Sequence, residues 1–196
     1  MKITLITLSG LLFVVLISYA FMKKSIRDTE QHNYIVLKSF DQVEIRQYES
    51  AIFSSVKIAA SNYKTTSGQG FRTLAGYIFG SNENNEKIAM TSPVMMEFGE
   101  ESKMSFMVPS EYKMEDLPAP KDKNIIFEHV PVRVVAALTF SGWANDQKIE
   151  QYSHLLLSEL KKEGIETIGK IQFLGYNPPY DLVDRKNEVI VEVKWD

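Results

Sequence analysis

The order of helical and strand patterns repeats along this chain, and the repeat restricts the possible fold more than any other feature. Apolar residues recur at intervals of three and four over residues 67–79 and again over 145–163, which predicts two amphipathic helices. Two strand patterns precede each helix and two follow it; they lie at 43–46, 51–58, 87–98, 103–108, 125–130, 132–141, 171–176 and 188–195. Two ββαββ halves around one core predict an α+β domain, expected as a distorted antiparallel β-barrel with two main helices.

The ends of both predicted helices carry suitable capping residues. Ser67 is placed to cap the first helix and Gly80 to end it, while Asn145 and Gly164 take these positions in the second. One face of the first helix is apolar and must cover other apolar groups. This face consists of Phe71, Leu74, Ala75 and Ile78.

The N-terminus predicts a membrane segment. Residues 3–22 contain no charged side chain, and at about 1.5 Å per residue they are just long enough to cross a hydrocarbon core about 30 Å thick. Small residues at Ser18 and Ala20 would suit a signal peptidase, but the apolar run exceeds the roughly 7–15 residues usual in a signal peptide. We therefore expect residues 1–27 to be an uncleaved anchor rather than a cleaved signal segment.

The charges around this segment leave its orientation open. Lys2 precedes it and Lys23, Lys24 and Arg27 follow it, so the positive-inside rule favours a cytoplasmic domain. A short tail before a single apolar segment is, however, the usual arrangement of an export signal. On this ground we expect the domain on the exported side, either periplasmic or extracytoplasmic.

The remainder of the chain has the size and composition of one globular domain. We expect a short linker over residues 28–33 and a single domain over 34–196. Residues 31–196 hold 18 basic and 23 acidic side chains, and this acidic balance argues against nucleic acid as a partner. The chain has no cysteine, so its fold is compatible with either redox compartment.

The residue types that carry chemistry show no enzymatic pattern. The sequence has no HExxH, P-loop, GxGxxG or GxSxG motif and no cysteine nucleophile, which predicts a protein that is not an enzyme. His32 falls in the linker and is expected to be solvated. His129 shares a strand side with Ile125 and Phe127, so it is a candidate iron ligand, although a lone histidine there is more often structural.

Two further groups have both a functional and a structural interpretation. Five methionines offer thioether ligands for iron, or they fill an irregular core. They are Met90, Met95, Met96, Met104 and Met107. Arg185, Asn187 and Glu188 resemble a polar site, but a turn cap together with an ion pair that holds the last strand explains them equally well.

Two segments about ninety residues apart resemble a known family. The first is residues 70–82 (GFRTLAGYIFGSN), continuing to 87–94 (KIAMTSPV); the second is 175–179 (GYNPP), continuing to 185–189 (RKNEV). Together they resemble the SOUL heme-binding family, and the resemblance extends from about Tyr34 to the C-terminus.

The resemblance implies a non-enzymatic protein that binds heme or a related tetrapyrrole in a shallow hydrophobic pocket. The implied apolar contacts are Phe71, Leu74, Ala75, Ile78, Tyr180 and Leu182, with Arg72 and Lys186 as partners for the porphyrin propionates. Some family members have a proposed histidine ligand where this chain has Gln47. Gly68, Gly76 and Asp181 stand where other members have basic residues.

Three functional hypotheses follow from these patterns. The first is a membrane-tethered carrier or buffer of heme or another tetrapyrrole, with residues 3–22 in the lipid bilayer. The second is a binding module for another flat amphipathic small molecule. The third is a protein-interaction domain that uses the same apolar helix face. The protein partner and the oligomeric state stay open.

Overall fold

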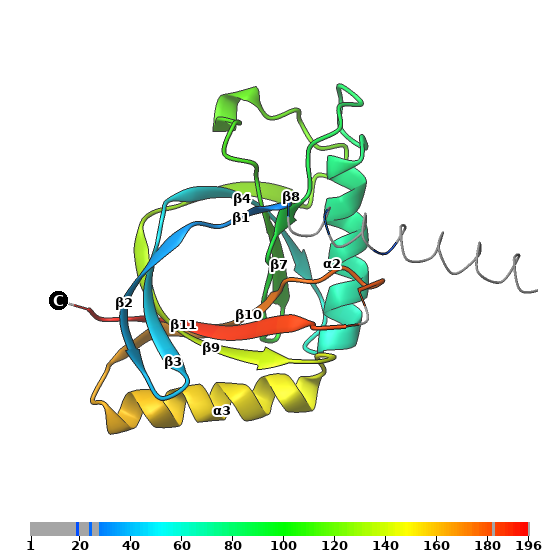
Figure 1. Ribbon diagram of the computed structural model, residues 1–196. Helices are drawn as coiled ribbons and strands as arrows, with labels where there is room; N and C mark the ends of the chain where they lie inside the picture. Colours follow the sequence, from blue (N-terminus) through cyan, green and yellow to red (C-terminus); the bar gives the residue numbers. More distant parts are fainter. Residues whose placement is uncertain (1–18, 20–23, 25–27, 182, 196) are drawn as a thin grey trace, which may run out of the picture.

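The computed structural model describes residues 19, 24, 28–181 and 183–195 (Figure 1). The expected membrane segment over residues 3–22 lies, apart from Tyr19, outside the described residues. Within the described part of the chain, no helix combines the length and apolarity that a membrane crossing requires. The anchor therefore stays a prediction.

The described chain forms the predicted α+β domain. Its two α-helices are α2 (Tyr63–Ile78) and α3 (Asp146–Lys162), and a single 3-10 turn covers Met114–Asp116. The strands are β1 (Glu30–Gln31), β2 (Tyr34–Phe40), β3 (Val43–Tyr48), β4 (Ala51–Ile58), β5 (Thr91–Ser92), β6 (Val94–Glu97), β7 (Ser102–Met107), β8 (Ile125–Val130), β9 (Arg133–Ser141), β10 (Thr167–Gly175) and β11 (Lys186–Val193).

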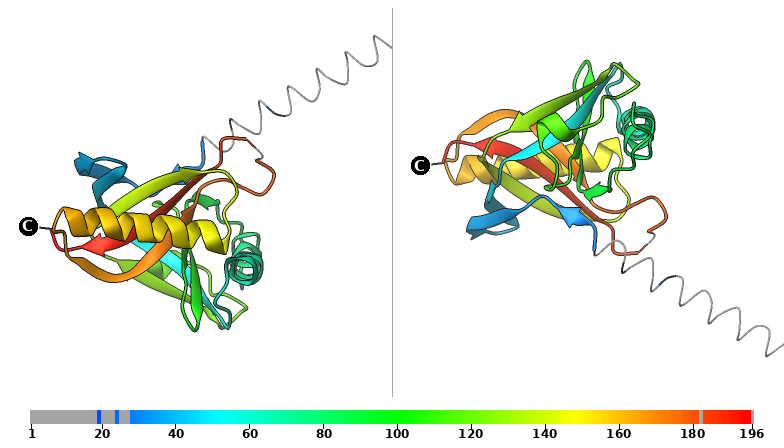
Figure 2. Two further views of the ribbon diagram at one scale, coloured as in Figure 1. Left: turned by 90° about the horizontal axis from the view of Figure 1, so that it is seen from below. Right: turned by 90° about the horizontal axis from the view of Figure 1, so that it is seen from above.

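Nine of these strands form one antiparallel sheet that is strongly curved but open. The strand order is β2-β3-β9-β11-β10-β6-β7-β4-β8, and β1 pairs separately with β5 in a parallel pair. Figures 1 and 2 show that the sheet is strongly curved and that both helices lie on its outside. We call the concave inner face of the sheet the hollow side. The expected closed barrel was wrong, because the two edge strands β2 and β8 are not paired with each other.

One long two-stranded ribbon, with β3 and β4 along one side and β9 and β8 along the other, explains both the curvature and the open edges. β3 and β4 are joined through Glu49 and Ser50, and β8 and β9 through Pro131 and Val132. The pairing keeps the same register across this bend, from Val43 opposite Leu138 to Val56 opposite Ile125. The ribbon therefore contributes to both ends of the strand order: β8, one of its own strands, is one edge, and β2, which pairs only with β3, is the other.

The helix ends agree with the sequence for α3 and differ for α2. Asn145 caps α3 by accepting a hydrogen bond from the backbone N–H of Lys148 at 2.8 Å, as predicted. The expected cap at Ser67 was wrong, because Asn62 caps α2 one turn earlier by accepting from the N–H of Thr65 at 2.9 Å. Ser67 lies inside α2, where its hydroxyl donates to the carbonyl of Lys64.

The main core lies between the helices and the outer face of the sheet. α2 packs on β4 and β7, while α3 packs on β9 and β11. Side chains alternate between the two faces along each strand, so every second residue enters this core and the others face the hollow side. The main core includes Val43, Ile45, Met104, Phe106, Leu138, Leu156, Phe173 and Val189.

Candidate functional site

The hollow side of the sheet carries a second, smaller apolar cluster. It comes from the alternate residues of the strands whose other residues enter the main core. Its buried members are Tyr48, Phe53, Met95, Met107, Val135, Ala137, Leu174 and Ile190. Charged residues lie on this same face, and such residues are rare in protein interiors unless they are paired.

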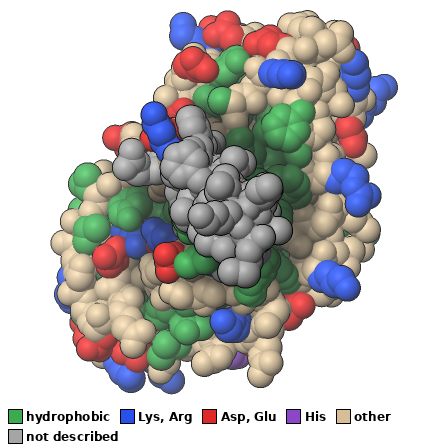
Figure 3. Space-filling model, turned by 45° about the vertical axis from the view of Figure 1, so that its right-hand side comes forward, with side chains coloured by type: hydrophobic (Ala, Val, Ile, Leu, Met, Phe, Trp, Pro, Cys, Tyr) green, Lys and Arg blue, Asp and Glu red, His purple; other side chains and the backbone are tan. Residues whose placement is uncertain are grey.

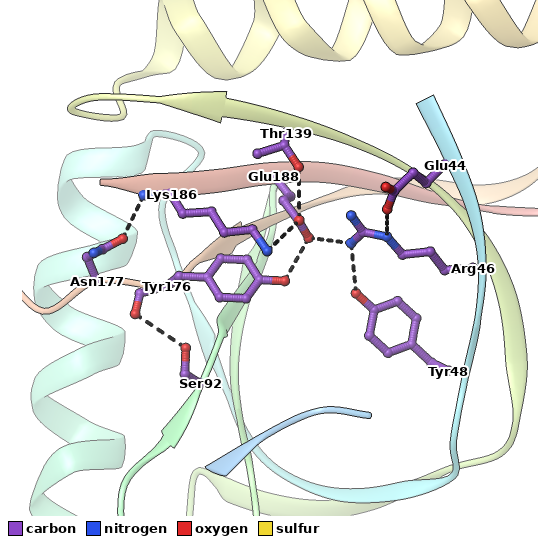
Figure 4. Close-up of polar contacts among 9 residues, drawn as sticks. All are labelled: Glu44, Arg46, Tyr48, Ser92, Thr139, Tyr176, Asn177, Lys186 and Glu188. Atoms are coloured by element: carbon purple, nitrogen blue, oxygen red, sulfur yellow. Dashed lines mark hydrogen bonds and ion pairs between the residues drawn. The ribbon is translucent and has the colours of Figure 1, made fainter. Parts of the chain in front are cut away.

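A buried glutamate is the centre of the polar groups on this face. Figure 4 shows Glu188 on β11, with its carboxylate approached from several strands. Its Oε2 accepts from Arg46 Nη1 at 2.9 Å and from the Tyr176 hydroxyl at 2.7 Å. Its Oε1 accepts from the Thr139 hydroxyl at 3.0 Å and lies 3.0 Å from Lys186 Nζ. The carboxylate, which is fully excluded from solvent, is thus satisfied at both oxygens.

The arginine opposite this glutamate also contacts several other groups of the protein. Arg46 Nε donates to the carboxylate of Glu44 at 2.7 Å, and Nη1 also donates to the Tyr48 hydroxyl at 3.4 Å. Its guanidinium lies over the ring of Tyr34, 4.4 Å from the ring centre. We call Glu44, Arg46, Tyr48, Thr139, Tyr176, Lys186 and Glu188 the Glu188 network.

The Glu188 network keeps its acid and base charged. Burial works to raise the pKa of Glu188, but the hydrogen bond and charge of Arg46 and the charge of Lys186 outweigh it, so the pKa lies below its ordinary value. Burial likewise works to lower the pKa of Arg46, and Glu188 outweighs it and raises this pKa. For Tyr176, burial and then the charge of Glu188 both raise the pKa, so the phenol stays protonated and donates.

A small cavity lies beside the Glu188 network on the same face. Its enclosed volume of about 10 Å³ is room for about one water molecule, and it is lined by His32, Tyr48, Phe53, Pro93, Met95, Arg133, Leu174 and Ile190. The expectation that His32 is solvated was wrong, because this side chain is only 8% exposed and its Nε2 lies 2.8 Å from the carbonyl of Glu49. Burial lowers the pKa of His32, which favours the neutral ring.

The predicted binding face of the first helix turns out to be mostly core. Leu74, Ala75 and Ile78 are buried against the sheet, so their side chains do not line an open pocket. Phe71 is half-buried and its ring packs against that of Phe106, with centroids 5.5 Å apart. Arg72 is exposed. A 3-4-3 apolar spacing marks any buried helix face, and it does not distinguish a core contact from a ligand contact.

The loop after the Pro-Pro bend is exposed but well anchored. Arg185 holds it by donating to the carbonyls of Pro178 at 2.9 Å, Asp181 at 2.8 Å and Asn177 at 3.1 Å. The same guanidinium lies 4.2 Å from the ring centre of Trp143. This arrangement confirms the turn-capping interpretation of Arg185.

The other predicted residues of this region have different environments. Tyr180 is 58% exposed at the tip of the loop, and Leu182 lies outside the described residues. Lys186 is directed to Glu188 and stacks on Tyr176, with its Nζ 4.1 Å from the ring centre. The predicted ion pair of Glu188 is confirmed, and its partners Arg46 and Lys186 can now be named.

The candidate metal ligands do not converge. His129 is exposed on β8, whereas Met96 and Met104 pack in the main core and Met95 and Met107 in the smaller cluster. Among the described residues there is no group of three or more His, Cys, Asp or Glu side chains that could hold a metal ion.

Sequence reasoning missed most of the hollow face. Arg133 interrupts a strand pattern that is otherwise mainly apolar, and this was the available signal for a buried charge. Arg46 gave no such signal, because its strand also contains Glu44 and Gln47. Its partner Glu188 lies far away in the sequence, at a distance of 142 residues. Strand alternation can assign a residue to a face, but it cannot identify the partner across the sheet.

Comparisons with solved structures show that the fold recurs in proteins of very different sequence. The chain is similar to the C-terminal domain of EcmrR, with a TM-score of 0.62 and 11% identity over 79% of this chain and 98% of that one. It is also similar to a structure described as a hydrolase from Listeria innocua, with a TM-score of 0.57 and 7% identity over 81% of this chain and 94% of that one. At these identities the likeness concerns the fold alone.

Comparisons of sequence are more specific. The chain is 32% identical to heme-binding protein 2 of Mus musculus and to that of Homo sapiens, over 74% of this chain and 75% of each relative. It is 28% identical to heme-binding protein 1 of Xenopus laevis, over 74% of this chain and 80% of that relative. The family model described as SOUL heme-binding protein matches residues 29–192. The resemblance seen in the sequence is thereby confirmed: the chain belongs to the SOUL heme-binding protein family.

Proposed function

We propose that this protein binds heme or a related tetrapyrrole without catalysing a reaction, as a carrier or buffer tethered to a membrane. The observation that carries the proposal is family membership over residues 29–192, together with relatives that are named heme-binding proteins. These names describe binding rather than catalysis, in agreement with a sequence that lacks the common catalytic motifs.

The dimensions of the hollow side favour a ligand on the outside of the domain. Pockets for drug-sized ligands measure about 300–1,000 Å³. The cavity, at about 10 Å³, is far smaller than this range, and a tetrapyrrole is a large, flat ring system. Burying such a ligand inside would require the sheet to open, whereas an exposed apolar surface accepts it without rearrangement.

An exposed apolar surface of this kind lies at the anchored loop. Trp143, Tyr180 and Val183 are 54%, 58% and 51% exposed, and Arg185 links Trp143 to the loop that carries the other two. We call these three residues the loop surface. Figure 3 shows hydrophobic side chains in several places on the side of the molecule that it draws, with charged groups among them. Large exposed aromatic groups are good contacts for a flat ring.

The energetics of such a site suit reversible binding. Burial of apolar area contributes roughly 25 cal/mol per Å², and an exposed cation such as Arg72 can pair with a propionate. A surface site buries one side of the ring less completely than a deep pocket. We therefore expect affinity on the order of micromolar, about −8 kcal/mol.

Iron contributes little in this proposal. Gln47 stands at the position of the histidine that is proposed as a ligand in some family members, and His129 is exposed at a strand on the sheet edge. Binding therefore rests on the ring and the propionates, so iron-free porphyrin should bind as heme does.

The proposed location combines this activity with the apolar N-terminus. Residues 3–22 would hold the domain at the bilayer, and the export-type arrangement of the N-terminus favours the exported side for the domain. A carrier at that position would keep an apolar ligand close to the membrane where such ligands partition.

The test is a titration of heme into the full chain, followed by visible absorbance. Tyr180→Asp and Trp143→Asp should each weaken heme binding at least tenfold, because a carboxylate in the loop surface disfavours both the ring and the propionates. Ile126→Asp is the matched control, since Ile126 is 43% exposed on β8, and it should bind as wild type does. Equal affinity in all four proteins would place the ligand elsewhere. Absence of any heme absorbance change would favour another flat ligand or a protein partner.

A further inference from the structure

The N-terminal end of the domain lies beside the loop that carries the loop surface. β1 pairs in parallel with β5, and this pairing places Gln31 opposite Ser92. The Ser92 hydroxyl donates to the carbonyl of Tyr176 at 3.3 Å, and Tyr176 is the first residue after β10. Figures 1 and 2 show the start of β1 and the chain between β10 and β11 on the same side of the molecule. The N-terminal end of the domain and the loop surface therefore share one side.

The predicted anchor would keep this side close to the bilayer. Residues 3–22 form the uncharged run, and Asp28 lies six positions after Met22. A fully extended chain spans at most about 3.6 Å per residue, so these positions reach about 20 Å. An anchored domain would therefore be held with its N-terminal side within this distance of the end of the apolar run.

The loop surface has the chemical character of groups that lie at a membrane interface. Trp143 and Tyr180 are exposed aromatic residues, and Val183 adds an exposed aliphatic one. Tryptophan and tyrosine are enriched where bilayer and water meet, because each combines an apolar ring with one polar N–H or O–H. Arg185 fixes the loop to backbone carbonyls and lies against Trp143, so this surface is held in place.

A second group of exposed apolar side chains lies on the opposite side of the molecule. Ile35, Val36 and Leu37 are exposed on β2. Figure 1 shows β2 on the side away from the chain between β10 and β11. A domain held at its N-terminal end would turn these residues away from the bilayer and the loop surface toward it.

We propose that the loop surface rests in the interface of the lipid bilayer, so that the domain docks on the membrane that holds it. Because the tether makes this contact intramolecular, a few apolar side chains suffice to maintain it. Asp184 is exposed in the same loop, so the contact does not depend on anionic lipids. This inference rests on the tether of the proposed function and deepens it, since a ligand at the loop surface would exchange with the bilayer rather than with water.

The first experiment measures whether Trp143 contacts lipid. The full chain is reconstituted in phosphatidylcholine nanodiscs with either ordinary or brominated acyl chains, because bromine quenches tryptophan fluorescence on contact. The chain has two tryptophans, so Trp195→Phe leaves Trp143 as the reporter, and it should lose at least half of its fluorescence in brominated lipid.

The matched control is Trp143→Phe, which leaves Trp195 as the reporter. Trp195 adjoins the C-terminus, which Figures 1 and 2 show on the side away from the chain between β10 and β11. Its fluorescence should be the same in both lipids.

The remaining outcomes of this experiment would overturn the docking. Equal fluorescence of Trp143 in both lipids would show that the domain stands away from the bilayer. Equal quenching of both reporters would show that no single side faces the lipid. A chain that elutes apart from the nanodiscs would overturn the tether together with the docking. Heme titration is a separate readout, so a failure of heme binding alone would leave the docking intact.

The second experiment places a charge in the loop surface. Tyr180→Asp, combined with Trp195→Phe, should recover at least half of the fluorescence that Trp143 loses in brominated lipid, because a carboxylate is costly to remove from water. Ile35→Asp is the matched control, since Ile35 is 60% exposed on β2, and it should leave the quenching unchanged. Quenching that persists in full in Tyr180→Asp would refute the assignment of the loop surface.

Discussion

The contacts of the Glu188 network lead to a quantitative prediction about stability, and the variant Glu188→Gln tests it. This change keeps the size and shape of the side chain and removes its charge. Arg46 would then lose its buried anionic partner at 2.9 Å, and Lys186 its partner at 3.0 Å. The side chains of Arg46 and Glu188 are 4% and 0% exposed, so water cannot replace the lost interaction.

The size of the effect follows from these contacts. Breaking a buried ion pair by removing one partner typically costs about 3–5 kcal/mol. Glu44 still pairs with Arg46 at 2.7 Å, but Glu44 is 40% exposed and compensates only part of the charge. Glutamine can also keep bonds to Tyr176 and Thr139. We therefore expect Glu188→Gln to lower the free energy of unfolding by an amount near the lower end of this range, about 3 kcal/mol.

The measurement is urea unfolding of the full chain at pH 7, followed by the fluorescence of its two tryptophans. Glu166→Gln is the matched control, since Glu166 pairs with Lys194 at 2.8 Å while both side chains are 66% exposed. Exposed pairs contribute about 0–1 kcal/mol, so this control should lose at most that amount.

The double variant Arg46→Met/Glu188→Met tests whether the loss of stability comes from leaving one buried charge without its partner. Replacing both partners of a buried pair with apolar residues is often neutral. The double variant should therefore be more stable than Glu188→Met alone. If Glu188→Gln were as mild as Glu166→Gln, the view of Glu188 as a buried, charged centre would be refuted.

Three further outcomes are expected. Burial lowers the pKa of His32 below 6.5, so below about pH 6.5 the unfolded chain takes up a proton that the folded chain does not. The free energy of unfolding should therefore keep its full value above about pH 6.5 and fall by up to about 1.4 kcal/mol per pH unit below it. His32→Phe should flatten this slope in unfolding curves taken from pH 5 to 7.5. Asn62→Ala should cost about 1 kcal/mol in urea unfolding because it removes the cap of α2, whereas an equal loss for Ser67→Ala would contradict the observed helix start. Full-length protein should stay in the membrane pellet after a carbonate wash, while a chain starting at Asp28 should be soluble; release of the full chain by carbonate would argue against an anchor.

The parts of the fold that were predictable depend on local periodicity. The second helix and its cap at Asn145 follow from residues within one or two turns of each other. The ββαββ order follows from the same kind of pattern. The start of α2 was missed because Asn62 precedes a first turn with few apolar residues, so the periodic pattern became clear only near Ser67.

The open sheet and the hollow face depend on contacts between distant residues. Nothing local in β3 shows that its partner is β9 or that β2 stays an edge. Glu188 was noticed as a polar residue that holds the last strand, but its bond to Arg46 joins residues 142 positions apart. The helix face at Leu74, Ala75 and Ile78 was assigned to a ligand, whereas the curved sheet covers it.

The most direct test of the central claim is a side-by-side titration of heme and iron-free protoporphyrin into the wild-type chain, with affinity measured by absorbance and by fluorescence quenching. We expect both to bind with dissociation constants on the order of micromolar and within about threefold of each other, because the ring and its propionates supply the interaction. His129→Ala should leave both values unchanged, since its exposed ring on β8 has no part in the site. Tight binding of heme that protoporphyrin does not share would show that iron is coordinated, and no saturable binding of either compound would contradict the proposed function.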